Sequence, residues 1–184
     1  YIPFLLGALF VAFAISYLGF FPSFVSNRAQ AGVGENVSGW AWSETIGWIS
    51  FNETTGGGDV SYGARIDPET GTMSGYAWSE NIGWIKFNPA GPFPSAPNYS
   101  AKLNPANGDA SGWIRACAGA ADANCSGDTS PDSGGWDGWI KLRKDADDTG
   151  ADYGVSLDIS SGEFNGWAWG GDVVGWVSFN STEP

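Results

Sequence analysis

Tryptophan is the residue type in this chain that is best suited to ligand binding. The 184 residues include 11 Trp, 11 Phe and 6 Tyr. An indole ring can stack on the apolar face of a sugar while polar neighbours orient its hydroxyl groups. The same rings can instead pack a core, and their return at fixed places in a repeat favours that role. We therefore predict packing within or between repeats, with carbohydrate binding as the alternative, for the repeat-core residues Trp40, Trp42, Trp78, Trp167 and Trp169.

The sequence lacks residues that several common catalytic mechanisms require. There is no histidine, which excludes Ser-His-Asp triads, Cys-His pairs and imidazole metal sites. Glu44 and Glu80 occupy equivalent predicted turns, and two carboxylates can hydrolyse a glycosidic bond. Glycoside hydrolysis needs the two carboxyl groups to differ in environment, one acting as acid and the other as base, and the sequence shows no such difference. Duplication of one unit explains the pair. We predict that the protein is not an enzyme and needs no cofactor.

Asp145, Asp147 and Asp152 are the candidate ligands for a metal ion. They lie in KDADDTGADYG, where oxygen-bearing residues alternate and Gly150 allows a sharp turn, as at the start of a calcium loop. The bidentate glutamate that closes such a loop is missing, because Ser156 stands at the twelfth position. A solvated acidic loop is the favoured interpretation, and calcium binding is the weaker one.

Cysteines, glycosylation motifs and charge indicate an extracellular setting. Cys117 and Cys125 lie close together in a stretch rich in Gly, Ala and Asp, which predicts a disulfide in an oxidising compartment. The net charge of -12 would repel phosphate, so no nucleic-acid partner is expected. Asn-X-Ser/Thr motifs give candidate glycosylation sites at Asn36, Asn52, Asn98, Asn124 and Asn180.

One sequence unit is repeated along the chain. VSGWAWSETIGWISFN at 37–52 returns as MSGYAWSENIGWIKFN at 73–88 and as FNGWAWGGDVVGWVSFN at 164–180. A split copy has SGWIR at 111–115 and GWIKL at 138–142. Alternating runs at 60–67, 98–104 and 152–159 precede three copies and end in the turns DPETG, NPANG and DISSG. The unit is predicted to be a three-stranded meander, giving about eleven strands in a closed or two-layer domain.

The last two strands of the unit predict a hairpin. With a loop at 43–46, Trp42 faces Gly47 and Trp40 faces Ile49. One face then carries Trp40, Trp42, Ile49 and Phe51, and the other carries Gly39, Ala41, Trp48 and Ser50. Because side chains alternate, a shift of one residue would exchange the two faces.

The first 25 residues differ from the rest of the chain. They read YIPFLLGALFVAFAISYLGFFPSFV and contain no charged side chain. A helix of this length would measure about 37 Å, enough to cross a hydrocarbon layer of about 30 Å. Being apolar on every face, it predicts a membrane anchor, the buried helix of an assembly, or a signal peptide cut near Ala29-Gln30-Ala31.

This segment resembles the N-terminus of mature type IV pilins of bacteria and archaea. Tyr1 takes the place of the aromatic residue that opens their long apolar helix, and Pro22 stands where many pilins bend. Leu5 replaces a glutamate that is usual in bacterial pilins and lacking in many archaeal ones. The resemblance implies a homopolymer, inserted in the membrane before assembly, with these assembly-helix residues: Tyr1, Phe4, Leu5, Leu9, Phe13, Leu18 and Pro22.

Three parts are therefore predicted: an apolar helix at 1–25, a linker at 26–35 and a repeat-built β domain at 36–184. The fold class is mainly β with one long N-terminal helix, the β part being an antiparallel sandwich or barrel of repeated meanders. The repeat also resembles tandem WAWSENIGWI-type sequences in surface proteins of uncultivated bacteria. The expected function is a structural subunit of an extracellular, cell-surface type IV pilus-like filament, with roles such as cell adhesion. The alternative is a secreted or membrane-anchored carbohydrate-binding domain with glycans as partners.

Overall fold

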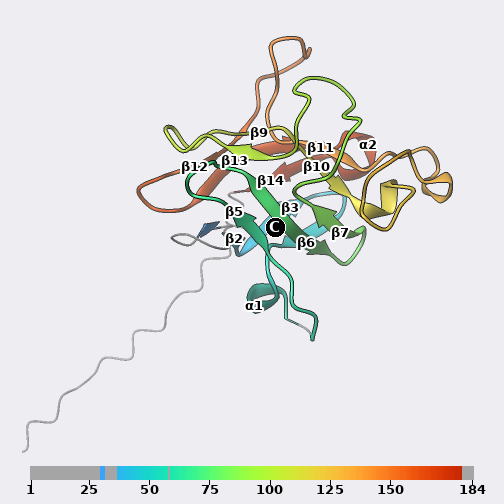
Figure 1. The fold of residues 1–184 in the computed structure, drawn as a ribbon, viewed down its shortest axis with the longest axis horizontal. Helices are drawn as coiled ribbons and strands as arrows, with labels where there is room; N and C mark the ends of the chain where they lie inside the picture. Colours follow the sequence, from blue (N-terminus) through green and yellow to red (C-terminus); the bar gives the residue numbers. More distant parts are fainter. Residues whose placement is uncertain (1–29, 32–36, 58, 180–184) are drawn as a thin grey trace, which may run out of the picture.

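Four β-hairpins, one from each copy of the repeat, form the centre of the molecule (Figure 1). The computed structural model describes residues 30–31, 37–57 and 59–179. The hairpins are β3 (Trp40–Ser43) with β4 (Gly47–Ser50), β6 (Met73–Ser79) with β7 (Gly83–Lys86), β10 (Trp113–Ala116) with β11 (Trp139–Lys141), and β13 (Phe164–Trp169) with β14 (Trp176–Ser178).

The hairpins close into an eight-stranded antiparallel barrel. β4 pairs with β6, β7 with β10, β11 with β13, and β14 with β3, which completes the ring. A closed sheet pairs the backbone groups that edge strands would leave exposed. Of the two predicted β architectures, the barrel is therefore the one found, and the sandwich is wrong.

Shorter strands continue the ladder at one end of the barrel. β2 pairs with β1 and β5, β5 with the first part of β6, β8 with β9, and β12 with the first part of β13. The leading strand of each predicted meander thus lies beyond the barrel and is not one of its eight strands. The bounds are β1 (Gln30–Ala31), β2 (Val37–Ser38), β5 (Ala64–Ile66), β8 (Lys102–Leu103), β9 (Ala110–Ser111) and β12 (Val155–Leu157).

Helix is a minor part of the described chain, and this corrects the predicted fold class. The described residues contain two one-turn α-helices, α1 (Glu53–Gly56) and α2 (Gly171–Val174), and two 3-10 turns, η1 (Cys117–Gly119) and η2 (Pro131–Ser133). No helix within this part of the chain is long and apolar enough to span a membrane. The long helix predicted at 1–25, with all its assembly residues, falls outside the described residues.

The hairpin register differs by one residue from the prediction. Trp42 pairs with Trp48 and Trp40 with Ser50, because the loop spans 44–46 and Gly47 closes it with a φ of +73°. A conformation with positive φ is one that glycine adopts readily. The shift moves Trp40, Trp42, Trp48 and Ser50 to one face, and Ala41 and Ile49 to the other.

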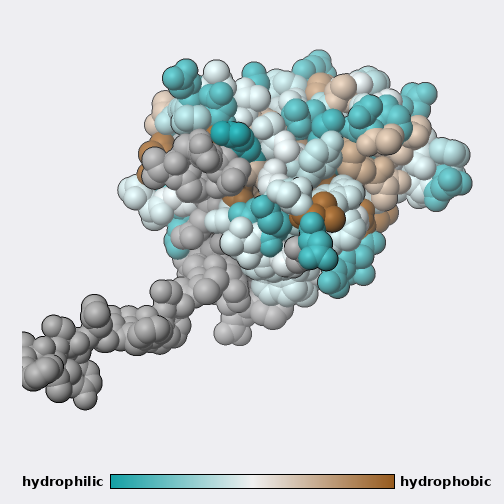
Figure 2. All heavy atoms as spheres, turned by 60° about the horizontal axis from the view of Figure 1, so that its bottom comes forward, coloured by the Kyte–Doolittle hydropathy of each residue, from teal (hydrophilic) through white to brown (hydrophobic). Residues whose placement is uncertain are grey.

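Aliphatic, alanine and phenylalanine side chains fill the barrel. A cavity of about 10 Å³ is all that remains among Phe51, Phe87, Phe179 and their neighbours. Figure 2 shows a face that is mostly hydrophilic or neutral, with few apolar patches. The buried core includes Val37, Ala41, Ile49, Phe51, Ala64, Met73, Ala77, Ile85, Phe87, Ile114, Ile140, Leu142, Val155, Phe164, Ala168, Val177 and Phe179.

The five tryptophans predicted as repeat core are not in this core. Trp40, Trp42, Trp78 and Trp169 are only partly buried, and Trp167 is 50% exposed. Their outward position follows from the one-residue difference in register, since the inward positions hold alanine and β-branched residues. The rings form aromatic clusters on the outside of the barrel, such as Trp42 against Trp48 with centroids 4.8 Å apart.

The three predicted turns are confirmed. The carboxylate of Asp67 accepts hydrogen bonds from the backbone N–H groups of Glu69 and Thr70 in DPETG. Asp158 does the same with Ser160 and Ser161 in DISSG. In both turns the closing glycine donates its N–H to the carbonyl of the first residue, as it also does in NPANG. Local Asx-turn chemistry therefore fixed these positions from sequence alone.

Candidate functional site

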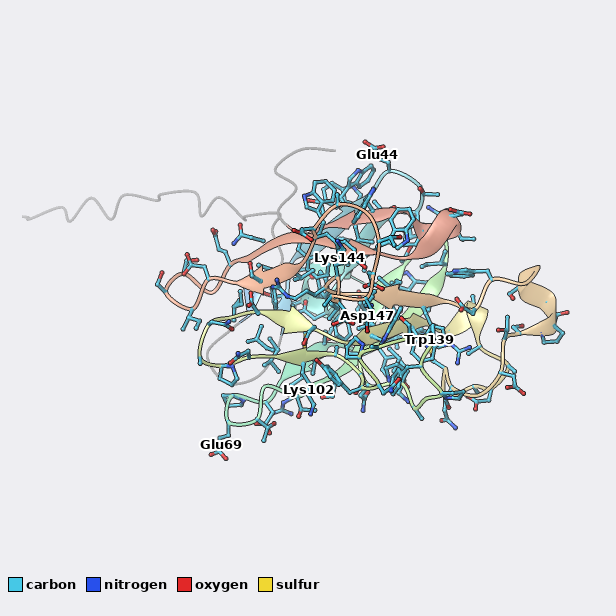
Figure 3. All side chains as sticks on the ribbon, turned by 90° about the horizontal axis from the view of Figure 1, so that it is seen from above. Glu44, Glu69, Lys102, Trp139, Lys144 and Asp147 are labelled. Atoms are coloured by element: carbon cyan, nitrogen blue, oxygen red, sulfur yellow. A yellow bond between two sulfur atoms is a disulfide. The ribbon has the colours of Figure 1, made fainter. Side chains whose placement is uncertain are left out.

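A groove of about 460 Å³ lies on the outside of the barrel between the third and fourth hairpins. We call it the Lys141 groove. Figure 3 shows Trp139, one of its wall residues, beside the loop that carries Lys144 and Asp147. The residues that line it include Pro94, Trp113, Asp137, Trp139, Lys141, Asp148, Thr149, Gly150, Ala151, Tyr153, Trp169, Gly171 and Trp176.

Strand alternation explains why aromatic rings gather here. Every second residue of β10, β11, β13 and β14 points away from the core, and in the repeat these positions are mostly Trp. Lys141 pairs directly with Trp169 across the junction of β11 and β13. Ring centroids lie 4.7 Å apart for Trp169 and Trp176, and 5.1 Å apart for Tyr153 and Trp176. The groove thus has closely packed aromatic walls.

The outer end of the groove leaves large aromatic rings in contact with solvent. Trp176 is 43% exposed and Trp167 is 50% exposed. A shallower hollow of about 270 Å³ shares Tyr153 and Trp176 with the groove and adds Trp167 and Asp152. Neighbouring exposed aromatic rings beside a concave surface are typical of an interaction site.

A buried ammonium group forms the polar part of the groove. The side chain of Lys141 is 5% exposed, and its Nζ lies 2.5 Å from Oδ2 of Asp148 and 3.0 Å from Oδ2 of Asp145. The same Nζ stands 5.2 Å from the ring centroid of Trp113. The hydrogen bond from Lys141, followed by that from the backbone N–H of Asp145, lowers the pKa of Asp148. Lys141 is therefore paired with two carboxylates.

Tyr153 supplies a neutral hydroxyl at the groove wall. Burial raises its pKa to about 12, and the negative charges of Asp148 and Asp145 add to this effect. The phenol therefore stays protonated at neutral pH and can donate a hydrogen bond.

Comparison with protein-family models, curated proteins and solved structures gives no match. The groups that line the groove can take part in non-covalent recognition. Indole faces can stack on apolar ring faces, and the carboxylates, the ammonium and the phenol can hydrogen-bond to hydroxyl groups. Such an arrangement of groups can hold and orient a polar ring.

The predicted calcium ligands are not brought together. Asp145 pairs with Lys141, and Asp152 pairs with Lys144 at 3.1 Å, while Asp147 is exposed. Within residues 30–31, 37–57 and 59–179 no group of three or more His, Cys, Asp or Glu could hold a metal ion. Lysine ammonium groups neutralise two of the three carboxylates.

Glu44 and Glu80 remain on separate exposed loops, one in the first hairpin and one in the second. Figure 3 shows Glu44 at one edge of the molecule and Glu69 at the opposite edge. Neither Glu44 nor Glu80 lines the Lys141 groove.

The predicted disulfide between Cys117 and Cys125 is confirmed. It lies in the insertion between β10 and β11, which projects at the right of Figure 1. Sequence analysis missed Arg115, which holds this insertion by donating from Nε to the carbonyl of Asp137 and from Nη1 to that of Gly127, both at 2.8 Å. It also missed Lys141. The available signal for Arg115 was that it replaces the tryptophan that the other three copies have at this position.

The candidate glycosylation sites differ in how exposed their asparagines are. Asn98 and Asn124 are exposed, whereas Asn36 and Asn180 fall outside the described residues. Asn52 is 8% exposed, accepts a hydrogen bond from the N–H of Thr55 at 2.9 Å and donates to the carbonyl of Val37 at 3.2 Å. The amide of Asn52 is thus buried as the N-cap of α1 in the folded chain, and glycosylation at Asn52 stays a prediction.

Replacing Asp148 with asparagine should lower stability near pH 7 by about 1–2 kcal/mol, because Lys141 loses a charged acceptor in a part-buried site. The folded state lowers the pKa of Asp148 below an unfolded value of about 3.9. The contribution is therefore complete above about pH 5 and is lost as pH falls through the folded pKa. Urea unfolding of both proteins between pH 7 and pH 2.5 measures this.

Asp147→Asn is the matched control, since Asp147 is exposed in the same loop. The stability of Asp147→Asn should depend on pH in the same way as that of the unmodified protein. A stability difference for Asp148→Asn that stays constant down to pH 2.5 would contradict the ion-pair explanation.

Proposed function

We propose that the barrel is a carbohydrate-binding domain of an extracellular surface protein and that the Lys141 groove is its binding site. The observation that carries this proposal is the exposure of Trp167 and Trp176 at the end of a groove walled by further tryptophans. A volume of about 460 Å³ falls within the range of roughly 300–1,000 Å³ that is usual for ligand sites. The disulfide and the glycosylation motifs support the extracellular setting.

Charge favours a neutral glycan. The net charge of -12 repels polyanions at a distance, and Lys141 is already paired with two carboxylates. A sulfated or uronate-rich chain would have no free cation to meet among the residues that line the groove. Hydroxyl groups, in contrast, can accept from Tyr153 and donate to Asp148 or Asp137.

Trp176→Ala is expected to weaken binding of a neutral oligosaccharide at the Lys141 groove at least about tenfold, because it removes an exposed stacking face. The measurement is a titration of intrinsic tryptophan fluorescence and heat with cellohexaose, chitohexaose, xylohexaose and mannohexaose. The full chain is kept in a detergent whose head group is not a sugar.

Trp84→Ala is the control, because Trp84 occupies the equivalent place in the second hairpin but does not line the Lys141 groove. It packs against Trp78 and Tyr62, so it also reports the effect of losing an outer ring on stability. If no oligosaccharide binds, or if both variants lose affinity equally, the proposed site is wrong.

A second candidate function, a subunit of a pilus-like filament, is favoured by the 25 uncharged residues at the start of the sequence. Exposing so many apolar side chains to water is unfavourable, and burial among identical segments would relieve it. Electron microscopy of the purified full chain tests this. We expect filaments from the unmodified chain and none from the double variant Leu9→Arg, Phe13→Arg, whose oligosaccharide binding should be unchanged. Particles without helical order in both samples would reject the filament.

A further inference from the structure

A second groove, of about 520 Å³, lies between the first and second hairpins. We call it the Trp48 groove. Its volume is close to the 460 Å³ of the Lys141 groove. It is lined by Trp40, Ile46, Gly47, Trp48, Gly56, Gly57, Trp78, Glu80 and Asn81.

The two grooves are built from equivalent positions of the repeat. Trp40, Trp48 and Trp78 correspond to Trp113, Trp139 and Trp169 of the Lys141 groove. Each groove lies where the second strand of one hairpin meets the first strand of the next. At those junctions Ser50 pairs with Trp78, and Lys141 pairs with Trp169. The backbone therefore presents the same three rings in the same arrangement.

The barrel places these grooves on opposite sides. The strand order around the ring is β3-β4-β6-β7-β10-β11-β13-β14. The junction of β4 with β6 and the junction of β11 with β13 are four strands apart in this ring of eight, which is half a turn. Two junctions lie between them, β7 with β10 and β14 with β3. The junction of β7 with β10 is occupied differently, since Lys86 donates to the carbonyl of Asn124 in the insertion at 3.0 Å.

The Trp48 groove carries less charge than the Lys141 groove. Ser50 replaces Lys141, and its hydroxyl donates to the carbonyl of Asn52 at 2.9 Å and accepts from Tyr62 at 2.8 Å. Glu80 is the charged residue among those that line the groove. Asn81 donates to the carbonyl of Ile46 at 3.0 Å, which fixes its amide at the groove wall. The surface combines stacking rings with the amide of Asn81 and a single carboxylate, that of Glu80.

We propose that the Trp48 groove is a second site for neutral glycans and that the barrel is bivalent. This inference rests on the proposed function of the Lys141 groove. Because the sites face away from each other, one short oligosaccharide does not reach both. The barrel instead bridges two separate glycan chains, and avidity strengthens attachment to a polysaccharide layer.

Bivalency is tested by calorimetry on the full chain in the same detergent. The ligand is the hexasaccharide, among the four named above, that binds most tightly. We expect a stoichiometry of two per chain. Trp48→Ala and Trp139→Ala should each reduce it to one, and the double variant should not bind. The unmodified chain should also precipitate the neutral polymer that matches the hexasaccharide backbone, among hydroxyethyl cellulose, glycol chitin, arabinoxylan and galactomannan, and the single variants should not.

A variant that keeps the packed rings tests whether misfolding, rather than loss of a site, reduces the stoichiometry. Glu80→Trp places a bulky ring at an exposed position of the Trp48 groove and should likewise reduce the stoichiometry to one. A stoichiometry of one that Trp139→Ala abolishes and that Trp48→Ala and Glu80→Trp leave unchanged overturns the second site while the proposed function stands. Absence of binding to all four hexasaccharides overturns both.

Discussion

Arg115→Met is expected to lower the free energy of unfolding by about 3 kcal/mol or more. Arg115 is 1% exposed, and its guanidinium donates to four backbone carbonyls. It also lies 4.6 Å from the ring centroid of Trp139. Methionine fills a similar volume but donates nothing, so these carbonyls lose their donor inside the folded chain. The acceptors are Asp137 at 2.8 Å, Gly127 at 2.8 Å, Asp128 at 3.3 Å and Gly119 at 3.4 Å.

The measurement is urea unfolding followed by tryptophan fluorescence. Arg65→Met is the control, because Arg65 is exposed on β5, and a change within about 0.5 kcal/mol is expected. Burial lowers the pKa of Arg115, whereas the nearby charges of Asp137, Asp122 and Asp128 raise it. The guanidinium stays charged at neutral pH, so the effect of Arg115→Met should not vary between pH 6 and pH 8.

At position 115, the effect of one substitution on the free energy of unfolding should change sign when the insertion is removed. Trp42, Trp78 and Trp169 stand at this position in the other copies. Arg115→Trp should destabilise the natural chain, since the insertion loses its anchor. In a chain whose residues 116–138 are replaced by Ser-Glu-Asn-Ile-Gly, the loop of the second copy, Arg115→Trp should be neutral or stabilising. Destabilisation in both chains would mean that the insertion does not account for the arginine.

Features with a local cause were predictable from the sequence. The turns at Asp67 and Asp158 follow from a carboxylate that binds nearby backbone N–H groups. The disulfide follows from two cysteines in one short loop. Hairpins in each copy follow from strict alternation of residue types around a turn. Apart from the third hairpin, whose strands are separated by the insertion at 117–138, these features depend on neighbours within about ten residues.

The register of the hairpins was harder to predict, because one residue of loop length decides it. The loop 44–46 closes on Gly47, whereas a loop one residue longer would have put Trp40 and Trp42 on the same face as Ile49 and Trp48 on the other face. The inner positions of the barrel accept Ala41 and Ile49, which have no polar atom to satisfy. Indoles, in contrast, carry an N–H that needs a partner when buried. That asymmetry favours the observed register and would have given the correct faces.

The groove depends on contacts that no local pattern reveals. Lys141 comes from β11, Asp148 from the following loop and Trp176 from β14, and barrel closure brings them together. A closed ring follows from pairing between different copies, such as β14 with β3, which are far apart in sequence. Sequence analysis therefore singled out tryptophan, with packing as its favoured role and carbohydrate binding as the alternative, but did not predict which residues share a groove.

Gly166→Ala should lower the free energy of unfolding by about 3 kcal/mol or more. Gly166 has a φ of +88°, and a Cβ added there would lie 2.0 Å from the carbonyl oxygen of Gly154. That oxygen accepts from the N–H of Trp167 at 3.2 Å, so the clash would separate β13 from the strand that pairs with it. A left-handed conformation alone costs an L-residue about 1–2 kcal/mol, and loss of this pairing adds to it.

Gly134→Ala separates the two contributions, because Gly134 has a φ of +66° with nothing within 4 Å of an added Cβ. It should lose only about 1 kcal/mol. Gly75→Ala should match Gly166→Ala, since its φ is +83° and the added Cβ would lie 2.0 Å from the carbonyl oxygen of Gly63. Equal losses for all three variants in urea unfolding would mean that backbone strain alone limits these positions. A larger, shared loss at Gly75 and Gly166 would instead show that each copy of the repeat needs a side-chain-free residue where its strand passes from the outer ladder into the barrel.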